Sequence, residues 1–189
     1  MLEKVLENYP IYSQFLKGVK GCGPAMSGVI ISEIDITKAK YPSSLWMYAG
    51  LDTVDEVEAN GMRTGEQKGR SKKKEHLVEY QYIDRDGNLA TRIGITFNPF
   101  LKTKLTGVLS GCFLRAGDGP YQKIYHDYKN RLENHVKHKE KTKLHKHRMA
   151  IRYMIKRFLV DLHYHWRTIE GLPVPLEYSE AKLGLKHAA

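Results

Sequence analysis

The sequence predicts a mainly α-helical fold, a helix-hairpin-helix-containing helical domain with one inserted β-hairpin. Apolar residues recur at spacings of three and four over most of the chain, as they do on one face of a helix. A glycine-rich segment at residues 18–24 separates the first two of these stretches. Strand-forming residues on either side of an Asp-Gly turn, within residues 77–97, predict the hairpin.

Prolines divide the N-terminal part of the chain into helices. Pro10 kinks or splits the first helical pattern. Pro24 and Pro42 each stand at the start of a later pattern, where a residue without an amide proton is tolerated. The charged stretch at residues 52–76 has no regular period, and we expect it to be an exposed loop. The helices expected here are 2–17, 24–34 and 42–48.

The C-terminal half is expected to contain three longer helices. Asn98 caps the first of them and Pro99 takes its first position. Gly117 ends this helix, and a tract of lysines and histidines at residues 135–148 leads into the last one. The second and third helices are expected at 121–133 and 146–169. The segments of this probably single unit by length are 1–60, 61–97, 98–170 and a tail at 171–189.

Composition restricts the class of protein. The chain has 189 residues, of which 41% are hydrophobic and 28% are charged, as in globular domains. It is long enough to bury a core without disulfides, and two cysteines cannot form a disulfide scaffold. Its apolar runs are too short for a membrane span, and its first residues do not resemble a signal peptide. We therefore expect a cytoplasmic protein with no cofactor and no membrane contact.

Positive charge is concentrated in the middle of the chain. The formal net charge is +10, with −3 in residues 1–60, +14 in residues 61–157 and −1 in residues 158–189. A concentrated basic field attracts polyanions by steering and by counterion release. The expected partner is RNA, DNA or both. The alternatives are a solvated basic face and a basic module that binds an acidic protein.

Three groups of residues are candidate nucleic-acid contacts. The glycine-rich turn has the pattern of a helix-hairpin-helix, whose second helix presents backbone amides to a phosphate; a tight turn without a ligand is the alternative. A basic loop at residues 63–74 could follow a phosphate backbone, and the Lys/His tract could form a second basic surface. The predicted contacts are Lys20, Gly21, Gly23, Arg63, Lys68, Arg70, Lys72, Lys73, Lys74, Lys102, Lys104, Lys143, His145, Lys146, His147, Arg148 and Arg152.

Other chemistry has less support in the sequence. The four histidines of the Lys/His tract stand among lysines, whose charge opposes metal binding, so we expect no metal site. Cys22 at the start of a helix could be a reactive thiol, but packing is the favoured interpretation. Several tyrosines beside the basic segment, Tyr80 and Tyr82 among them, could stack on unpaired bases, with core or rim packing as the alternative.

Several segments together resemble a known family. They are similar to the C-terminal, helix-hairpin-helix-containing domain of guide-RNA-using insertion-sequence transposases, over most of residues 15–170. This resemblance implies a domain that holds a structured guide RNA beside DNA. The kinship of that domain with the Nop-type domain of the phage-associated, guide-RNA-binding Tas proteins implies the same role. The segments are GVKGCGP (18–24), ISEI (31–34), YPSSLWMYAGL (41–51), NPFLKTKL (98–105) and MAIRYM (149–154).

The chain departs from that family in two respects. It lacks the acidic RNase-H-like domain, and Asn60-Gly61 stands where the family has its nucleophilic serine before a glycine. Ser71 is the nearest catalytic candidate. We therefore expect this chain alone to hold nucleic acid without being an enzyme. The alternative is a transposase or recombinase subunit that works with a separate RNase-H-like domain, and the long helices from residue 98 onward leave a homodimer open.

Overall fold

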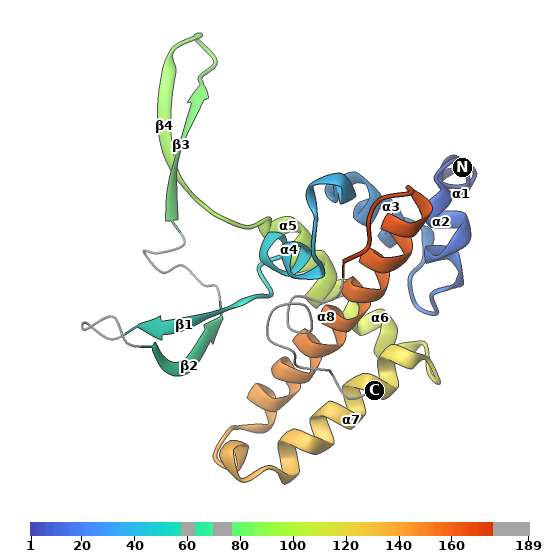
Figure 1. Cartoon of the computed structure of the whole chain (residues 1–189), viewed down its shortest axis with the longest axis vertical. Helices are drawn as coiled ribbons and strands as arrows, with labels where there is room; N and C mark the ends of the chain where they lie inside the picture. Colours follow the sequence, from blue (N-terminus) through green and yellow to red (C-terminus); the bar gives the residue numbers. More distant parts are fainter. Residues whose placement is uncertain (58–62, 70–76, 176–189) are drawn as a thin grey trace.

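Helices dominate the computed structural model, which describes residues 1–57, 63–69 and 77–175 (Figure 1). Residues 53–57 and 63–69 are described by their backbone alone. The helices form one body, and two antiparallel hairpins extend from it on one side. The predicted mainly α fold with an inserted β-hairpin is confirmed.

Prolines place the N-terminal helices where the sequence predicts them. Pro10, Pro24 and Pro42 each occupy the first turn of a helix. Pro10 splits the first predicted helix into two. The elements are α1 (Leu2–Leu6), α2 (Pro10–Gln14), the 3-10 turn η1 (Leu16–Gly18), α3 (Pro24–Glu33), the 3-10 turn η2 (Ile36–Lys38) and α4 (Pro42–Tyr48).

The predicted hairpin consists of β3 (Leu77–Ile83) and β4 (Leu89–Ile95), which pair without a shift of register. Its turn follows from side-chain chemistry. Asp84 Oδ1 accepts hydrogen bonds from the amides of Asp86 and Asn88, at 2.9 and 2.8 Å. Gly87 has a φ of +84°, a conformation that glycine adopts without strain. The local sequence therefore determines this element.

The expectation of a loop over residues 52–76 is wrong in part. Strand β1 (Thr53–Val57) pairs with β2 (Arg63–Gly69), with a register shift between Asp55 and Val57. Two glycines and three charged residues give β2 little strand propensity. The segment boundary expected after residue 60 falls between these two paired strands, so the inserted region includes β1.

One long helix organises the C-terminal half. α8 (Lys143–Ile169) begins three residues earlier than predicted, because Thr142 Oγ1 accepts the His145 amide at 3.2 Å and caps the helix. Asn98 caps the preceding segment as predicted, and its Oδ1 accepts the Leu101 amide at 3.0 Å. The other elements are α5 (Pro99–Thr103), the π-helical η4 (Lys104–Leu109), α6 (Ser110–Arg115), α7 (Pro120–Asn134) and the 3-10 turn η5 (Val136–His138).

The core lies where α8 meets the helices on either side of it. Phe158 of α8 packs edge-on against Phe113 and Tyr121, with ring centroids 5.4 and 5.5 Å apart. Phe100 and Val108, which were predicted on the apolar stripe, are 48% and 46% exposed. They stand one residue away from the buried stripe, which recurs every four residues at Leu101, Leu105, Leu109 and Phe113.

Two buried polar side chains of α8 fasten it to the segment around η2. His163 Nε2 lies 2.9 Å from Ala39 O, and Arg167 Nη1 donates to Ile36 O and Ala39 O at 3.2 and 3.0 Å. Burial lowers the pKa of His163, which favours the neutral ring that can donate one hydrogen bond to a carbonyl. These contacts connect residues far apart in the sequence and hold the C-terminal half of α8 against the N-terminal helices.

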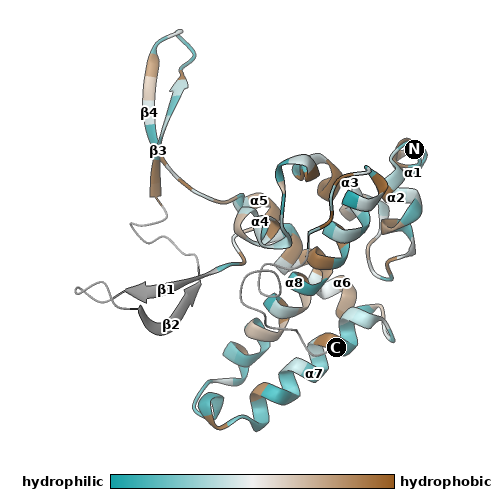
Figure 2. Ribbon diagram, viewed as in Figure 1, coloured by the Kyte–Doolittle hydropathy of each residue, from teal (hydrophilic) through white to brown (hydrophobic). Residues whose placement is uncertain are grey.

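Hydropathy separates the two ends of the helical body. Figure 2 shows α7 and the N-terminal half of α8 as largely hydrophilic, whereas apolar residues gather on α3 and on the rest of α8. The hydrophilic pair extends from the body and carries the Lys/His tract at its end. Within the part of the chain that the structure describes, no helix combines the length and the hydropathy that a membrane span requires.

Candidate nucleic-acid interface

The structure brings four of the predicted contact residues into one groove of about 430 Å³. Lys102 comes from α5, and His147, Arg148 and Arg152 come from α8. We call this feature the α5–α8 groove. Residues that are distant in the sequence meet here because α5 packs beside the N-terminal half of the long helix (Figure 1). The remaining lining residues are Leu51, Thr106, Leu144 and Ile151.

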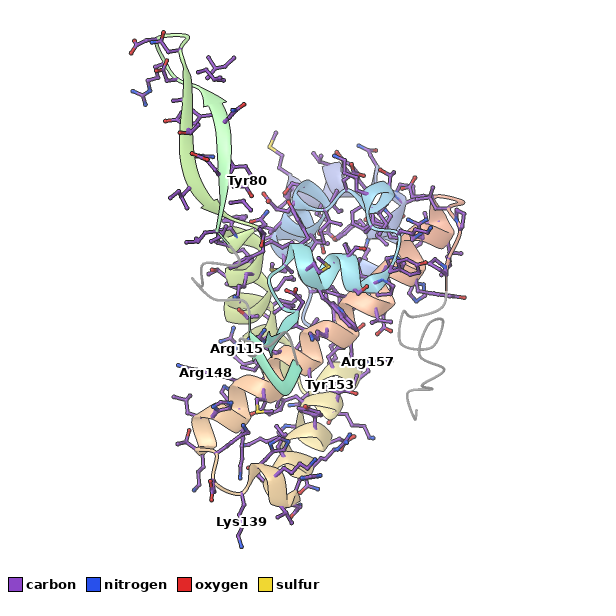
Figure 3. All side chains as sticks on the ribbon, turned by 60° about the vertical axis from the view of Figure 1, so that its left-hand side comes forward. Tyr80, Arg115, Lys139, Arg148, Tyr153 and Arg157 are labelled. Carbon is purple, nitrogen blue, oxygen red and sulfur yellow. The ribbon has the colours of Figure 1, made fainter. Side chains whose placement is uncertain are left out.

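Helical periodicity aligns the cations of α8. Arg148, Arg152 and Lys156 follow one another at intervals of four residues, which places them on the same face of the helix. Arg148 is exposed, and Figure 3 shows its side chain extending outward from α8. Arg152 and Lys156 are half-buried. The sequence analysis did not include Lys156, although the spacing of four identifies it.

Arg152 is held in place by backbone carbonyls. Its Nη2 donates to Leu51 O and to Asp52 O, both at 3.3 Å. These two carbonyls directly precede β1. Arg152 therefore joins α8 to the foot of the β1–β2 hairpin, whose second strand includes the predicted contacts Arg63 and Lys68.

The groove gathers like charges in a half-buried setting. Burial lowers the pKa of Lys102, and the nearby Arg152 guanidinium lowers it further. The same two causes, in the same order, lower the pKa of Lys156. The Asp52 carboxylate opposes both shifts. Because these cations repel one another and have lost part of their hydration, a bound anion would stabilise their charged forms.

Aromatic rings support two of these cations. Lys156 Nζ lies 4.9 Å from the ring centroid of Trp46, and Lys102 Nζ lies 4.5 Å from that of Phe97. Trp46 Nε1 donates to Lys156 O at 3.2 Å, which fixes the indole against α8. These cation–π contacts hold the ammonium groups at the surface of the groove.

Two further predicted residues have defined surroundings. Lys104 Nζ lies 5.2 Å from the ring centroid of Phe100, on the solvent side of the helix. His147 Nδ1 lies 2.6 Å from the hydroxyl of Tyr125 on α7. His147 therefore joins α7 to α8 in addition to lining the groove.

The first turns of α8 separate the Lys/His tract into exposed and buried residues. Lys143 and His145 are exposed. Lys146, which was predicted for the same basic surface, is only 9% exposed. It precedes the buried Ala150 and Met154 at intervals of four residues. Lys146 therefore belongs to the buried face of α8, and its assignment to the basic surface is corrected.

The glycine-rich turn forms a separate, open hollow. Lys20, Gly21 and Gly23 line it, together with Arg115 of α6, which the sequence analysis missed. Gly21 has a φ of +94°, and a Cβ there would lie 3.0 Å from the Phe113 ring. The close packing of this turn on α6 therefore requires glycine at position 21, whatever else the turn does.

The amides and the thiol of this turn are engaged in local contacts. Met26 and Ser27 both donate their amides to Gly23 O, at 3.0 Å each, in the first turn of α3. Burial raises the pKa of Cys22 to about 11, although the Ser27 hydroxyl, 3.6 Å from its Sγ, acts in the opposite direction. This environment disfavours the thiolate, so Cys22 is a packing residue.

Some predicted positions cannot be placed. Arg70, Ser71, Lys72, Lys73 and Lys74 lie outside the described residues, and so do the side chains of Arg63 and Lys68. Among the described residues, no three His, Cys, Asp or Glu side chains gather in a way that could hold a metal ion.

Comparison with known proteins identifies no relative. No protein-family model, no curated protein and no solved structure matches the chain. The resemblance to the transposase domain therefore rests on the five segments quoted above, and the helix-hairpin-helix stays a prediction.

Proposed function

We propose that this protein binds the phosphate backbone of a structured nucleic acid, most readily RNA, in the α5–α8 groove, and holds it without cutting it. The observation that carries this proposal is the convergence of Lys102, Arg148, Arg152 and Lys156 on one half-buried surface. Half-buried cations that repel one another are costly for the folded chain, and an anionic ligand offsets that cost.

The chemistry of the groove suits phosphate in particular. The exposed guanidinium of Arg148 can donate two parallel hydrogen bonds to one phosphate group. Lys102 and Lys156 add point charges nearby whose positions are fixed by aromatic rings. Contacts of this kind set affinity and register but carry no base sequence.

The family resemblance supports RNA as the ligand. The NPFLKTKL segment contains Lys102 and Lys104, and the MAIRYM segment contains Arg152. Two of the segments that resemble the transposase domain therefore meet at this groove. Because that family holds a guide RNA in its C-terminal domain, we propose the same class of ligand here.

The test is a titration of a labelled stem-loop RNA, and of the DNA of the same sequence, followed by fluorescence anisotropy across a salt series. We expect tight binding at about 50 mM salt and a steep loss of affinity towards 200 mM. Arg148→Ala should weaken binding and lower the salt slope by about one unit. Lys139→Ala removes an equal charge from the exposed end of the α7–α8 pair (Figure 3) and should change neither quantity.

Two results would contradict the proposal. The first is a chain that binds neither probe at low salt. The second is an equal loss of affinity in Arg148→Ala and Lys139→Ala, which would indicate attraction by net charge without a defined groove. Tighter binding of the DNA probe would keep the groove and replace RNA with DNA as its ligand.

A further inference from the structure

The β3–β4 hairpin presents a surface that the groove does not explain. It extends away from the helical body (Figure 1), and most of its residues are exposed. Alternation along the strands places Tyr80 and Tyr82 on the same face as Arg92 of β4. Both tyrosines are 42% exposed. Large aromatic rings on an outer face of a two-stranded hairpin have no core to fill.

The geometry of this face is that of a flat platform. The Arg92 guanidinium lies over the Tyr82 ring, 5.4 Å from its centroid. The Tyr80 hydroxyl donates to Ile95 O at 3.0 Å. A Cβ at Gly94 would lie 2.6 Å from the Tyr80 ring, so this ring rests directly on the backbone of β4. One side of the Tyr80 ring is thus covered by main chain.

Charge on this face is positive. Glu79 and Gln81 alternate with the tyrosines and therefore stand on the opposite face. The Asp84 carboxylate accepts two amides within the turn at the end of the hairpin. Arg92, between the two tyrosines across the strand pair, is the charged residue of the platform. A face of ring, guanidinium and ring complements an anionic ligand that has flat, apolar parts.

We propose that Tyr80, Arg92 and Tyr82 form a stacking platform for unpaired bases. This inference rests on the proposed function, to which it adds a substrate class: a nucleic acid with a single-stranded segment beside its structured part. Stacking on tyrosine is tolerant of base identity because every base has a π face. The hairpin adds base contacts to the phosphate contacts of the groove, so ligands with unpaired bases bind more tightly than ligands without bases.

The opposite face of the hairpin suggests the competing occupant. Ile83, Leu89 and Ile93 are 72%, 70% and 73% exposed on that face. Exposed aliphatic residues of this kind are typical of protein contacts. A protein partner or a second copy of the chain on this face is therefore an outcome that the experiment must separate from base stacking.

The experiment compares an oligouridine with an abasic oligonucleotide of the same length, which has the phosphates without the bases. Tyr82→Leu should weaken oligouridine binding roughly tenfold, because stacking contributes about 1–3 kcal/mol for each base. It should leave the affinity for the abasic strand unchanged. Tyr82→Trp should restore binding, which separates lost stacking from a damaged hairpin. The matched control Ile93→Thr, on the opposite face, should bind both strands like the wild type.

Photo-crosslinking gives an independent readout. A strand that carries 5-iodouridine should form its adduct with Tyr80 or Tyr82, identified by mass spectrometry of the digested protein. Equal binding of oligouridine and the abasic strand by the wild type would overturn the platform and leave the groove proposal standing. Binding of neither strand would overturn both. Loss of self-association in Ile93→Thr, with Tyr82→Leu unaffected in every assay, would assign the hairpin to protein contact.

Discussion

The glycine-rich turn and the α5–α8 groove are both basic and were both predicted as nucleic-acid contacts, but they are built differently. In the turn, Gly21 packs against α6, and Lys17 beside it pairs with Glu7. In the groove, Lys102 and Lys156 stand near a third cation, Arg152, and their pKa values are lowered. The conformation of the turn is accounted for by packing, whereas the groove concentrates charge at a cost to the folded chain.

This difference shows what a local motif can and cannot indicate. A glycine pattern identifies a backbone that turns tightly, and here the neighbouring helix explains that turn fully. A cluster of cations that repel one another is not required by packing, so it points more directly to a ligand. The predictions below contradict or sharpen this distinction, from the largest expected effect to the smallest.

The largest effect is expected from Gly21→Ala. A side chain there would be strained at a φ of +94° and would press on the Phe113 ring and on Cys112 O. Strain and overpacking together should lower the free energy of unfolding by about 3 kcal/mol. Urea denaturation measures this change, and Gly23→Ser is the control because open space surrounds position 23. An unchanged stability combined with lost nucleic-acid binding would reassign Gly21 to phosphate contact.

Arg152→Met should affect the groove in two ways. Nucleic-acid affinity should fall about tenfold, and loss of the bonds to Leu51 O and Asp52 O should cost about 1 kcal/mol of stability. Removal of the repelling charge should also raise the pKa of Lys102 and Lys156, which NMR of labelled lysine side chains reports. The exposed Arg131→Met on α7 is the matched control. Lysine pKa values that stay unchanged in Arg152→Met would contradict the like-charge account.

Alkaline pH should weaken the turn through Cys22. Its folded pKa, about 11, is above that of an exposed thiol, so the folded state holds the proton that the unfolded state releases. This contribution to stability is complete below pH about 8.5 and is lost as pH rises, by about 1 kcal/mol per pH unit. Thermal melts should therefore show a smaller alkaline loss in Cys22→Ala than in the wild type. Parallel losses would indicate that the thiol is not buried as described.

The smallest effect is spectroscopic. Trp46 lies under Lys156 at the edge of the basic surface, whereas the other tryptophan, Trp166, is buried and donates to Glu170 at 3.3 Å. In Trp166→Phe, RNA binding should change the emission of the remaining indole. In Trp46→Phe, the emission of Trp166 should stay constant. A change only in the second variant would place the ligand at the other end of α8.

The sequence predicted the elements whose chemistry is local. Proline at the start of α2, α3 and α4, the Asn98 cap and the Asp-Gly turn of β3–β4 each act within a few residues. The β1–β2 pairing was missed because β2 has weak intrinsic strand propensity and its pairing depends on tertiary context.

The groove was predicted only as separate residues. Lys102, Arg148 and Arg152 were named from their charge, but their meeting depends on how α5 packs beside α8. The interval of four from Arg148 to Lys156 was a usable signal that was missed. The same periodicity, continued back from Met154 and Ala150, would have shown that Lys146 is buried.

The most direct test of the central claim is a pair of charge reversals, Arg148→Glu in the groove and Lys20→Glu at the turn, titrated with the same stem-loop RNA. Both side chains are exposed, and the two substitutions change the net charge equally. We expect Arg148→Glu to weaken binding more than tenfold and Lys20→Glu to weaken it only by the small long-range effect of charge. The reverse order would place the phosphate contact at the glycine-rich turn and contradict the account.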